Sequence, residues 1–159
     1  MITATDKEYL KRAVGLAKKA LEAGDEPFGS VLVSNDGDVL YEDHNHVSSG
    51  DQTQHPEFAI ARWAALYLKN EERSQATVYT SGEHCPMCAS AHAFVGLGRI
   101  VYASSSKQLR QWKQEWGVQA GNVKGLAIQD VVHQIEVDGP DEELSEQVRL
   151  LHEQKHKSK

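Results

Sequence analysis

The chain contains only two cysteines among its 159 residues, Cys85 and Cys88. A disulfide framework of the kind that stabilises small secreted domains needs more thiols at wider spacing. The sequence therefore excludes a disulfide scaffold and favours metal binding or redox chemistry for this pair.

Long hydrophobic runs are also absent. No apolar stretch approaches the roughly 20 residues that a transmembrane helix needs, and no charged segment followed by an apolar run marks a signal peptide. We therefore expect a cytoplasmic protein with no membrane association.

Positive charge is in short supply. The chain has 17 Lys and Arg residues against 23 Asp and Glu residues, which gives a net charge of −6. Proteins that bind nucleic acid usually carry a basic face that neutralises phosphates, and no Lys/Arg cluster here marks a phosphate site. The charge therefore argues against a nucleic-acid partner. The length of the chain and its content of 40% hydrophobic residues predict a single globular domain over residues 1–159.

Two short motifs carry the chemistry, His55-Pro56-Glu57 and Cys85-Pro86-Met87-Cys88. His55, Cys85 and Cys88 supply three ligands for Zn²⁺, and a site with three protein ligands keeps its fourth position open for water. The spacing matches a zinc deaminase signature in which the Glu is the general acid/base and is not a ligand. We therefore predict zinc as the cofactor and Glu57 as the catalytic residue.

Periodicity and turn signals predict an alternation of helices and strands. A capping box at Thr5-Asp6-Lys7-Glu8 opens a first helix over 6–23, and Asp36-Gly37 joins two strands in a hairpin. The predicted strands are 29–34, 39–43, 77–80, 99–103 and a stretch within 131–137. The other predicted helices are 56–69, one from Pro86 to residue 94 or 95, and one from about residue 140, whereas 107–116 is helix or loop and 117–125 is loop.

This order predicts an α/β fold with a five-stranded mixed sheet covered by helices on both faces. Strand–helix alternation favours parallel pairing with right-handed crossovers, with one antiparallel hairpin. His55 and Cys85 each lie at a helix start, where free amide groups stabilise thiolates and oxyanions.

The chain resembles the cytidine-deaminase-like superfamily, in the branch of free-base and tRNA adenosine deaminases. The resemblance rests on Pro27-Phe28-Gly29-Ser30-Val31, Asn45, His55-Pro56-Glu57, residues 79–88 and Arg99-Ile100-Val101-Tyr102-Ala103. It implies a three-layer α/β/α fold, a zinc-activated water and a homodimer. It also implies that Asn45 hydrogen-bonds the base and that Glu83 steadies the loop before Cys85 by accepting backbone amides.

Two departures from the family pattern bear on the substrate. His84 replaces the usual Pro, and the segment after residue 102 lacks the Asp-rich loop of bacterial guanine deaminases but offers two tryptophans and Glu115. We predict that this segment closes a pocket for a small-molecule substrate and stacks on a flat ring. The predicted substrate contacts are Phe28, Asn45, His84, Trp112 and Glu115.

The predicted activity is zinc-dependent hydrolytic deamination of a small amino-heterocycle, a guanine-like purine or a pyrimidine or triazine analogue, with release of ammonia. The enzyme alternatives are tRNA adenosine-to-inosine editing and a nucleoside or nucleotide deaminase. Other classes are a thioredoxin-like redox site at the Cys pair, a structural zinc with His84 as a fourth ligand, and a zinc-binding protein without catalysis. Metal binding separates the first of these from the rest, and ammonia release separates an enzyme from the others.

Overall fold

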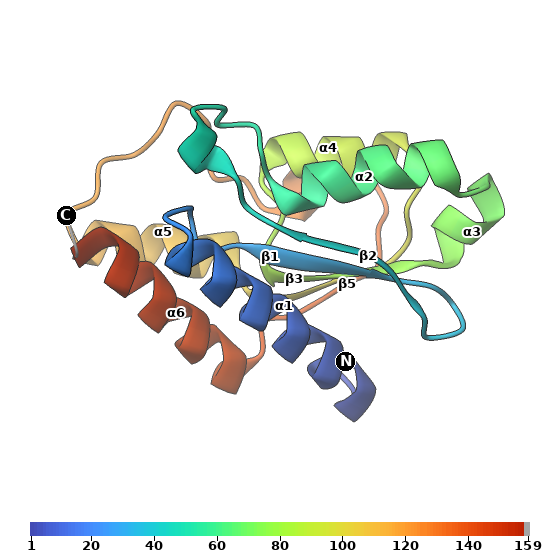
Figure 1. The fold of residues 1–159 in the computed structure, drawn as a ribbon, viewed down its shortest axis with the longest axis horizontal. Coiled ribbons are helices and arrows are strands. Elements are labelled where there is room, and N and C mark those ends of the chain that lie inside the picture. Colours follow the sequence, from blue (N-terminus) through green and yellow to red (C-terminus); the bar gives the residue numbers. More distant parts are fainter. Residues whose placement is uncertain (158–159) are drawn as a thin grey trace.

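The computed structural model describes residues 1–157, so residues 158 and 159 of the predicted domain lie outside it. A sheet of five strands lies between two helical layers (Figure 1). One layer holds α1 (Ala4–Glu22), α5 (Ser106–Glu115) and α6 (Glu142–Lys157), and the other holds α2 (Pro56–Tyr67), α3 (Asn70–Gln75) and α4 (Pro86–Phe94). The predicted three-layer α/β/α architecture is confirmed.

The strands lie in the order β2 (Val39–His44), β1 (Gly29–Val33), β3 (Thr77–Gly82), β4 (Ile100–Ser104) and β5 (Val137–Asp138). β1 is antiparallel to both β2 and β3, whereas β3–β4 and β4–β5 are parallel. The sheet is mixed, as predicted, but antiparallel pairing is not confined to the hairpin. The parallel crossover from β2 through α2 reaches β3 across one intervening strand, so β2 and β3 end at the same edge of the sheet.

Two local predictions differ from the structure, and two short elements were not predicted. The capping box at the start of α1 is formed by Thr3 and Asp6, not by Thr5 and Glu8, because the helix begins at Ala4. The fifth strand is only Val137–Asp138, since Val131, Val132 and Ile135 fill the core next to Ile128 without joining the sheet. Helix α3 was not predicted, and neither was the 3-10 turn η1 (Val47–Ser49) that follows β2.

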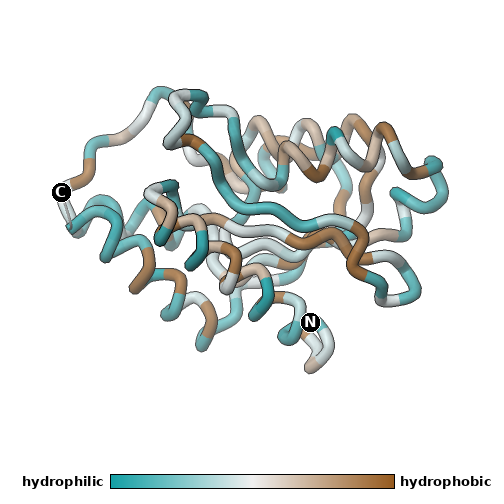
Figure 2. The backbone as a smooth tube through the Cα atoms, in the orientation of Figure 1, coloured by the Kyte–Doolittle hydropathy of each residue, from teal (hydrophilic) through white to brown (hydrophobic). Residues whose placement is uncertain are grey.

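The two faces of the sheet bury separate apolar clusters. Val31, Val33, Tyr79 and Val101 pack against α1 and α6, whereas Leu32 on the opposite face packs with α2. The alternation follows from the period of two along a strand. Figure 2 shows that hydrophilic and hydrophobic stretches also alternate along α6, as expected for a helix with one face on the sheet.

Over residues 1–157, no helix is long and apolar enough to cross a membrane.

A buried ion pair ties α1 to the sheet. Asp6 accepts two hydrogen bonds from the guanidinium of Arg99, at 2.8 and 2.9 Å, and a third from the Tyr79 hydroxyl at 2.7 Å. Burial alone would raise the pKa of Asp6, but the hydrogen bonds from Arg99, Thr3 and Tyr79 outweigh it and hold the pKa well below its usual value. Asp6 is therefore a charged carboxylate at neutral pH.

We expect Asp6→Asn to lower the free energy of unfolding by about 2–3 kcal/mol at pH 7, because charge-assisted hydrogen bonds to a buried partner are lost. A depressed folded-state pKa stabilises the protein above the unfolded value of about 4, and this contribution is lost as pH falls toward the folded value. Urea unfolding at pH 7 and pH 3 measures both effects. Glu8→Gln, at an exposed carboxylate of the same helix, is the control, and an equal loss in both variants would contradict the prediction.

Candidate active site

Two helix starts meet at the edge where β2 and β3 end. His55 is the N-cap of α2 and Cys85 is the N-cap of α4, and each is followed by a proline at the first helical position. Proline fits there because its missing N–H would have no partner inside the helix. The parallel direction of β2 and β3 explains why groups 30 positions apart in sequence share one site.

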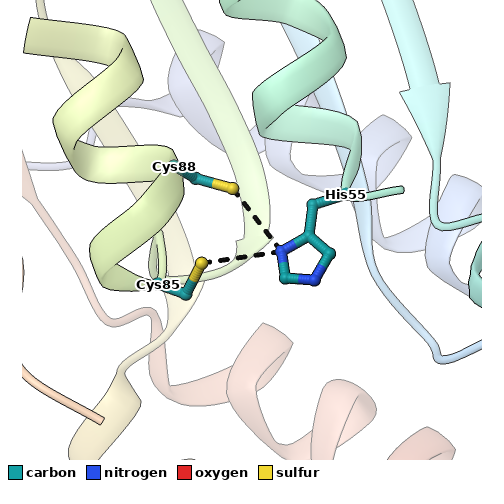
Figure 3. A group of neighbouring side chains, drawn as sticks. All are labelled: His55, Cys85 and Cys88. Atoms are coloured by element: carbon teal, nitrogen blue, oxygen red, sulfur yellow. Dashed lines mark hydrogen bonds between the residues drawn. The ribbon is translucent and has the colours of Figure 1, made fainter. Parts of the chain in front are cut away.

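The three predicted metal ligands are brought together by these helix starts (Figure 3). The Nδ1 atom of His55 lies 3.5 Å from the sulfur of Cys85 and 3.5 Å from the sulfur of Cys88. Zinc–nitrogen and zinc–sulfur bonds of about 2.0 and 2.3 Å at a tetrahedral angle place the two ligand atoms about 3.5 Å apart. The donor set and its spacing therefore fit a zinc ion with one position open.

The ligands are also suited to a cation electrostatically. Hydrogen bonds from Cys88 and His55 outweigh burial and lower the pKa of the Cys85 thiol to about 4. A thiolate at neutral pH is the form that binds metal. His84 is not part of the group, so the structural-zinc alternative with His84 as a fourth ligand has no geometric support.

Glu57 lies one helical position beyond Pro56 and is 5% exposed. Its Oε1 atom accepts hydrogen bonds from the Thr80 hydroxyl at 2.9 Å and from the Ser30 hydroxyl at 3.0 Å. Burial raises the pKa of Glu57, while His55 and the two hydroxyls act in the opposite direction. A carboxyl group with a raised pKa, held in one orientation, is suited to taking up and returning a proton.

We expect Thr80→Val to lower kcat about tenfold, because a lost hydrogen bond of about 1.4 kcal/mol leaves Glu57 less well oriented. The substitution keeps the shape of a residue on a buried strand and leaves the zinc ligands intact. Steady-state ammonia release with metal analysis tests it. Thr77→Val at the start of the same strand is the control, and equal kcat values for both variants would contradict the positioning role.

The motif around Phe28 forms another part of the wall of the cavity in front of the zinc ligands. A Cβ atom at Gly29 would collide with the backbone of Ala13 and Ala17 in α1, so only glycine allows this strand to lie so close to the helix. Phe28 lines the cavity, and its ring makes an edge contact with His152 at a centroid distance of 5.0 Å. His152 belongs to α6, so the C-terminal helix supports the wall of its own cavity from behind.

The cavity in front of His55, Glu57 and Cys85 has a volume of about 440 Å³. Its far wall is formed by one side of α5 and by the loop that follows, residues 118–126. The prediction that the segment after residue 102 closes the pocket therefore agrees with the geometry, although its tryptophans do not take part.

Trp112 and Glu115 do not line the cavity. Trp112 is buried in the core that α1 and α6 share, next to the ring of Trp116, and Glu115 is exposed beside Gln111. The physical reason is the rotation of α5 about its axis, which turns Leu109, Arg110 and Lys113 to the cavity. In the described monomer, substrate contacts from Trp112 and Glu115 have no geometric support.

Asn45 and His84 also lie outside the cavity lining. The side-chain oxygen of Asn45 accepts the amides of Glu26 and Val47, at 3.3 and 3.0 Å, and so holds the backbone behind Phe28. His84 is 1% exposed, its ring meets His92 edge-on, and burial lowers its pKa well below the usual value. Substrate contact by either residue stays a prediction that the cavity lining does not support.

Glu83 links three parts of the site. Its two carboxylate oxygens accept the amides of Ser106 at 2.9 Å and of Ile128 at 2.7 Å. The predicted role of steadying the loop before Cys85 agrees with these contacts, which also tie that loop to α5 and to the turn η2 (Ile128–Asp130).

Three cationic side chains at the cavity were not predicted from the sequence. Arg110, Lys113 and Lys124 line it, and no carboxylate among residues 1–157 forms an ion pair with any of them within 4.0 Å. The sequence predicts no basic cluster that marks a phosphate site, and the structure places these three cations at the cavity. The spacing of Arg110 and Lys113 on one helix was visible in the sequence, but the fold alone brings Lys124 to them.

Comparisons with known proteins find a deaminase family and related deaminases. The family described as "Cytidine and deoxycytidylate deaminase zinc-binding region" matches residues 3–104. A probable cytosine deaminase of Schizosaccharomyces pombe is 32% identical over 142 residues, which cover 85% of this chain and 83% of that one. A guanine deaminase of Bacillus subtilis is 39% identical over 98 residues, covering 60% and 62%.

A solved structure from a study of A-to-I editing by tRNA:A34 deaminases has a similar fold. It superposes with a TM-score of 0.66 at 24% identity and covers 91% of this chain and 99% of that chain. The similarity in fold therefore covers more of the chain than the family match over residues 3–104.

Proposed function

The chain belongs to the zinc-binding cytidine and deoxycytidylate deaminase family and is a hydrolytic deaminase, and we propose that its substrate is a small amino-heterocycle, a free nucleobase of the guanine or cytosine type. The observation that carries the proposal is Glu57, which is buried beside the three zinc ligands at one wall of a 440 Å³ cavity. A zinc ion bound there lowers the pKa of a water molecule at its open position.

The residues of the chain then have distinct tasks. Glu57 takes one proton from the attacking water and delivers it to a ring nitrogen as the hydroxyl adds to the ring carbon. It then takes the second proton from that hydroxyl and delivers it to the amine, which leaves as ammonia while the carbonyl forms. Ser30 and Thr80 hold the carboxylate in place. Phe28 offers an aromatic ring at the cavity wall, where a flat heterocycle can pack against it.

The experiment is ammonia release by the zinc-loaded protein from a panel of substrates. The panel holds guanine, adenine, cytosine and an amino-triazine, the matching nucleosides and 5′-monophosphates, and a tRNA anticodon stem-loop. Turnover of one or more free bases, with nucleosides, nucleotides and RNA inert, supports the proposal. Turnover of the RNA alone would replace it with tRNA editing.

A second candidate is a base that carries a phosphate, as a nucleotide or within RNA. The cations Arg110, Lys113 and Lys124 at the cavity favour it, since unpaired cations attract an anionic substrate. Arg110→Gln with Lys113→Gln should then raise KM for a monophosphate at least tenfold and leave KM for the free base unchanged. Lys107→Gln, which changes α5 outside the cavity, is the matched control.

We also propose that the chain forms a homodimer. Leu66 and Tyr67 at the end of α2 and Phe94 at the end of α4 are exposed, Phe94 at 89%. Helices α2 and α4 pack together, so these apolar side chains lie at one end of that layer. Sedimentation at micromolar concentration tests this, and a Phe94→Glu variant should shift the protein toward the monomer.

A further inference from the structure

A second group of metal-binding side chains lies at the end of the edge strand β2. Asp25, His44 and His46 each place one donor atom within 4.8 Å of those of the other two. None of the three lines the cavity or belongs to the His55–Cys85–Cys88 group. Within residues 1–157, this group is therefore separate from the candidate active site.

The backbone holds these residues in place. His44 ends β2 and is paired with Gly29, and the amide of Asn45 donates to the carbonyl of Phe28 at 3.0 Å. The carboxylate of Asp25 accepts the amide of Ser48 at 2.9 Å, which ties the loop before β1 to the turn after β2. His44 ends β2 and His46 precedes the turn η1, and their rings lie against each other with centroids 4.3 Å apart.

Each imidazole has one nitrogen committed as a donor. The Nδ1 atom of His44 lies 2.8 Å from the carbonyl oxygen of Asn45, which can only accept, so Nδ1 carries the proton and Nε2 keeps a lone pair. The Nε2 atom of His46 lies 3.0 Å from Oδ1 of Asp43, which leaves the lone pair on Nδ1. Metal-binding histidines are usually oriented in this way, by a carbonyl or carboxylate on the other ring nitrogen.

The charge around the rings also suits a cation. Burial raises the pKa of Asp25, but hydrogen bonds from Ser48, together with the electrostatic effect of the nearby His46 and His44, outweigh it and lower the pKa overall. Asp25 is 3% exposed, so its negative charge is shielded from water. Two imidazoles and a charged carboxylate form a donor set that suits zinc and neighbouring divalent transition metals.

We propose that Asp25, His44 and His46 bind a second divalent transition-metal ion, with Asp43 as the carboxylate that orients His46. None of the three residues lines the cavity, so the ion takes no direct part in the proposed reaction. Asn45 lies between His44 and His46 in the sequence. An ion bound to the two histidines would therefore also fix the backbone that Asn45 holds behind Phe28.

The test is the number of zinc equivalents that metal-stripped protein binds in competition with a chromophoric chelator. The wild type should bind two equivalents and His46→Gln one, with unchanged far-ultraviolet circular dichroism. Asp43→Asn should keep two but weaken the second about 10–100-fold, as expected for an orienting carboxylate. His133→Gln, an exposed histidine outside the group, is the control and should bind two.

A crossed set of variants separates this site from the deaminase site. Cys85→Ser with Cys88→Ser should retain one equivalent, and the addition of His46→Gln should remove it. A single equivalent in the wild type, or two equivalents in His46→Gln, would overturn the proposal. Failure of every substrate in the ammonia panel would overturn the proposed substrate class and leave the stoichiometry, and therefore this proposal, unaffected.

Discussion

Glu57→Gln is expected to lower the rate of ammonia release by about three orders of magnitude, within the range typical for loss of a general acid/base. Gln keeps the size of the side chain and can still accept hydrogen bonds from Ser30 and Thr80, but it cannot take up a proton. The other cavity carboxylate, Glu83, cannot replace it, because both of its oxygens already accept backbone amides. The measurement is kcat for the best substrate of the panel, with the zinc content determined on the same sample.

Zinc content separates loss of catalysis from loss of the metal. Glu57 is not a ligand in the proposed site, so Glu57→Gln should bind the same zinc equivalents as the wild type. Glu115→Gln is the matched control, since Glu115 is an exposed carboxylate outside the cavity. Residual kcat within about tenfold of the wild type would contradict the proton-transfer role of Glu57.

The zinc ligands could be predicted from the sequence because their geometry is local. Cys85 and Cys88 are three positions apart at a helix start, so they share one helix face whatever the rest of the fold does. His55 needed one further step, the meeting of two helix starts at one edge of the sheet. That step rests on the parallel direction of β2 and β3, which strand–helix alternation indicates.

The fifth strand and the far wall of the cavity were less predictable. Val137–Asp138 forms only two ladder pairs, with Ile100 and Val101, and a strand that short has no periodicity to read. The apolar residues before it satisfy the same pattern as a strand, yet they fill the core near Ile128. Hydrophobic pattern alone does not distinguish these two outcomes.

The rotation of α5 decided which predicted substrate contacts lie at the cavity. Trp112 was predicted to stack on a ring, but α6 offers His152 and a large apolar face that buries the indole instead. This packing turns Arg110 and Lys113 to the cavity. The choice between an aromatic and a cationic wall therefore depends on a contact with a helix about 40 residues later in the chain, which no local pattern encodes.

Cys88→Ser is expected to reduce zinc affinity more than about 100-fold, beyond the effect of losing an orienting partner, and to remove ammonia release at limiting zinc. Cys88 is completely buried and lies beside the His55 nitrogen. Water therefore cannot take the place of the lost thiolate ligand without a rearrangement of α4. Because zinc binds the folded state, saturating metal also stabilises the wild type by about 3–4 kcal/mol at 100 to 1,000 times Kd. The variant should therefore lose most of the zinc-dependent rise in Tm, and excess zinc should restore part of its activity.

Met87→Leu, which conserves side-chain volume between the two cysteines, is the control and should keep both the rise in Tm and the activity. Full activity of Cys88→Ser at limiting zinc would show that the catalytic metal does not depend on this thiolate, and it would contradict the proposed site.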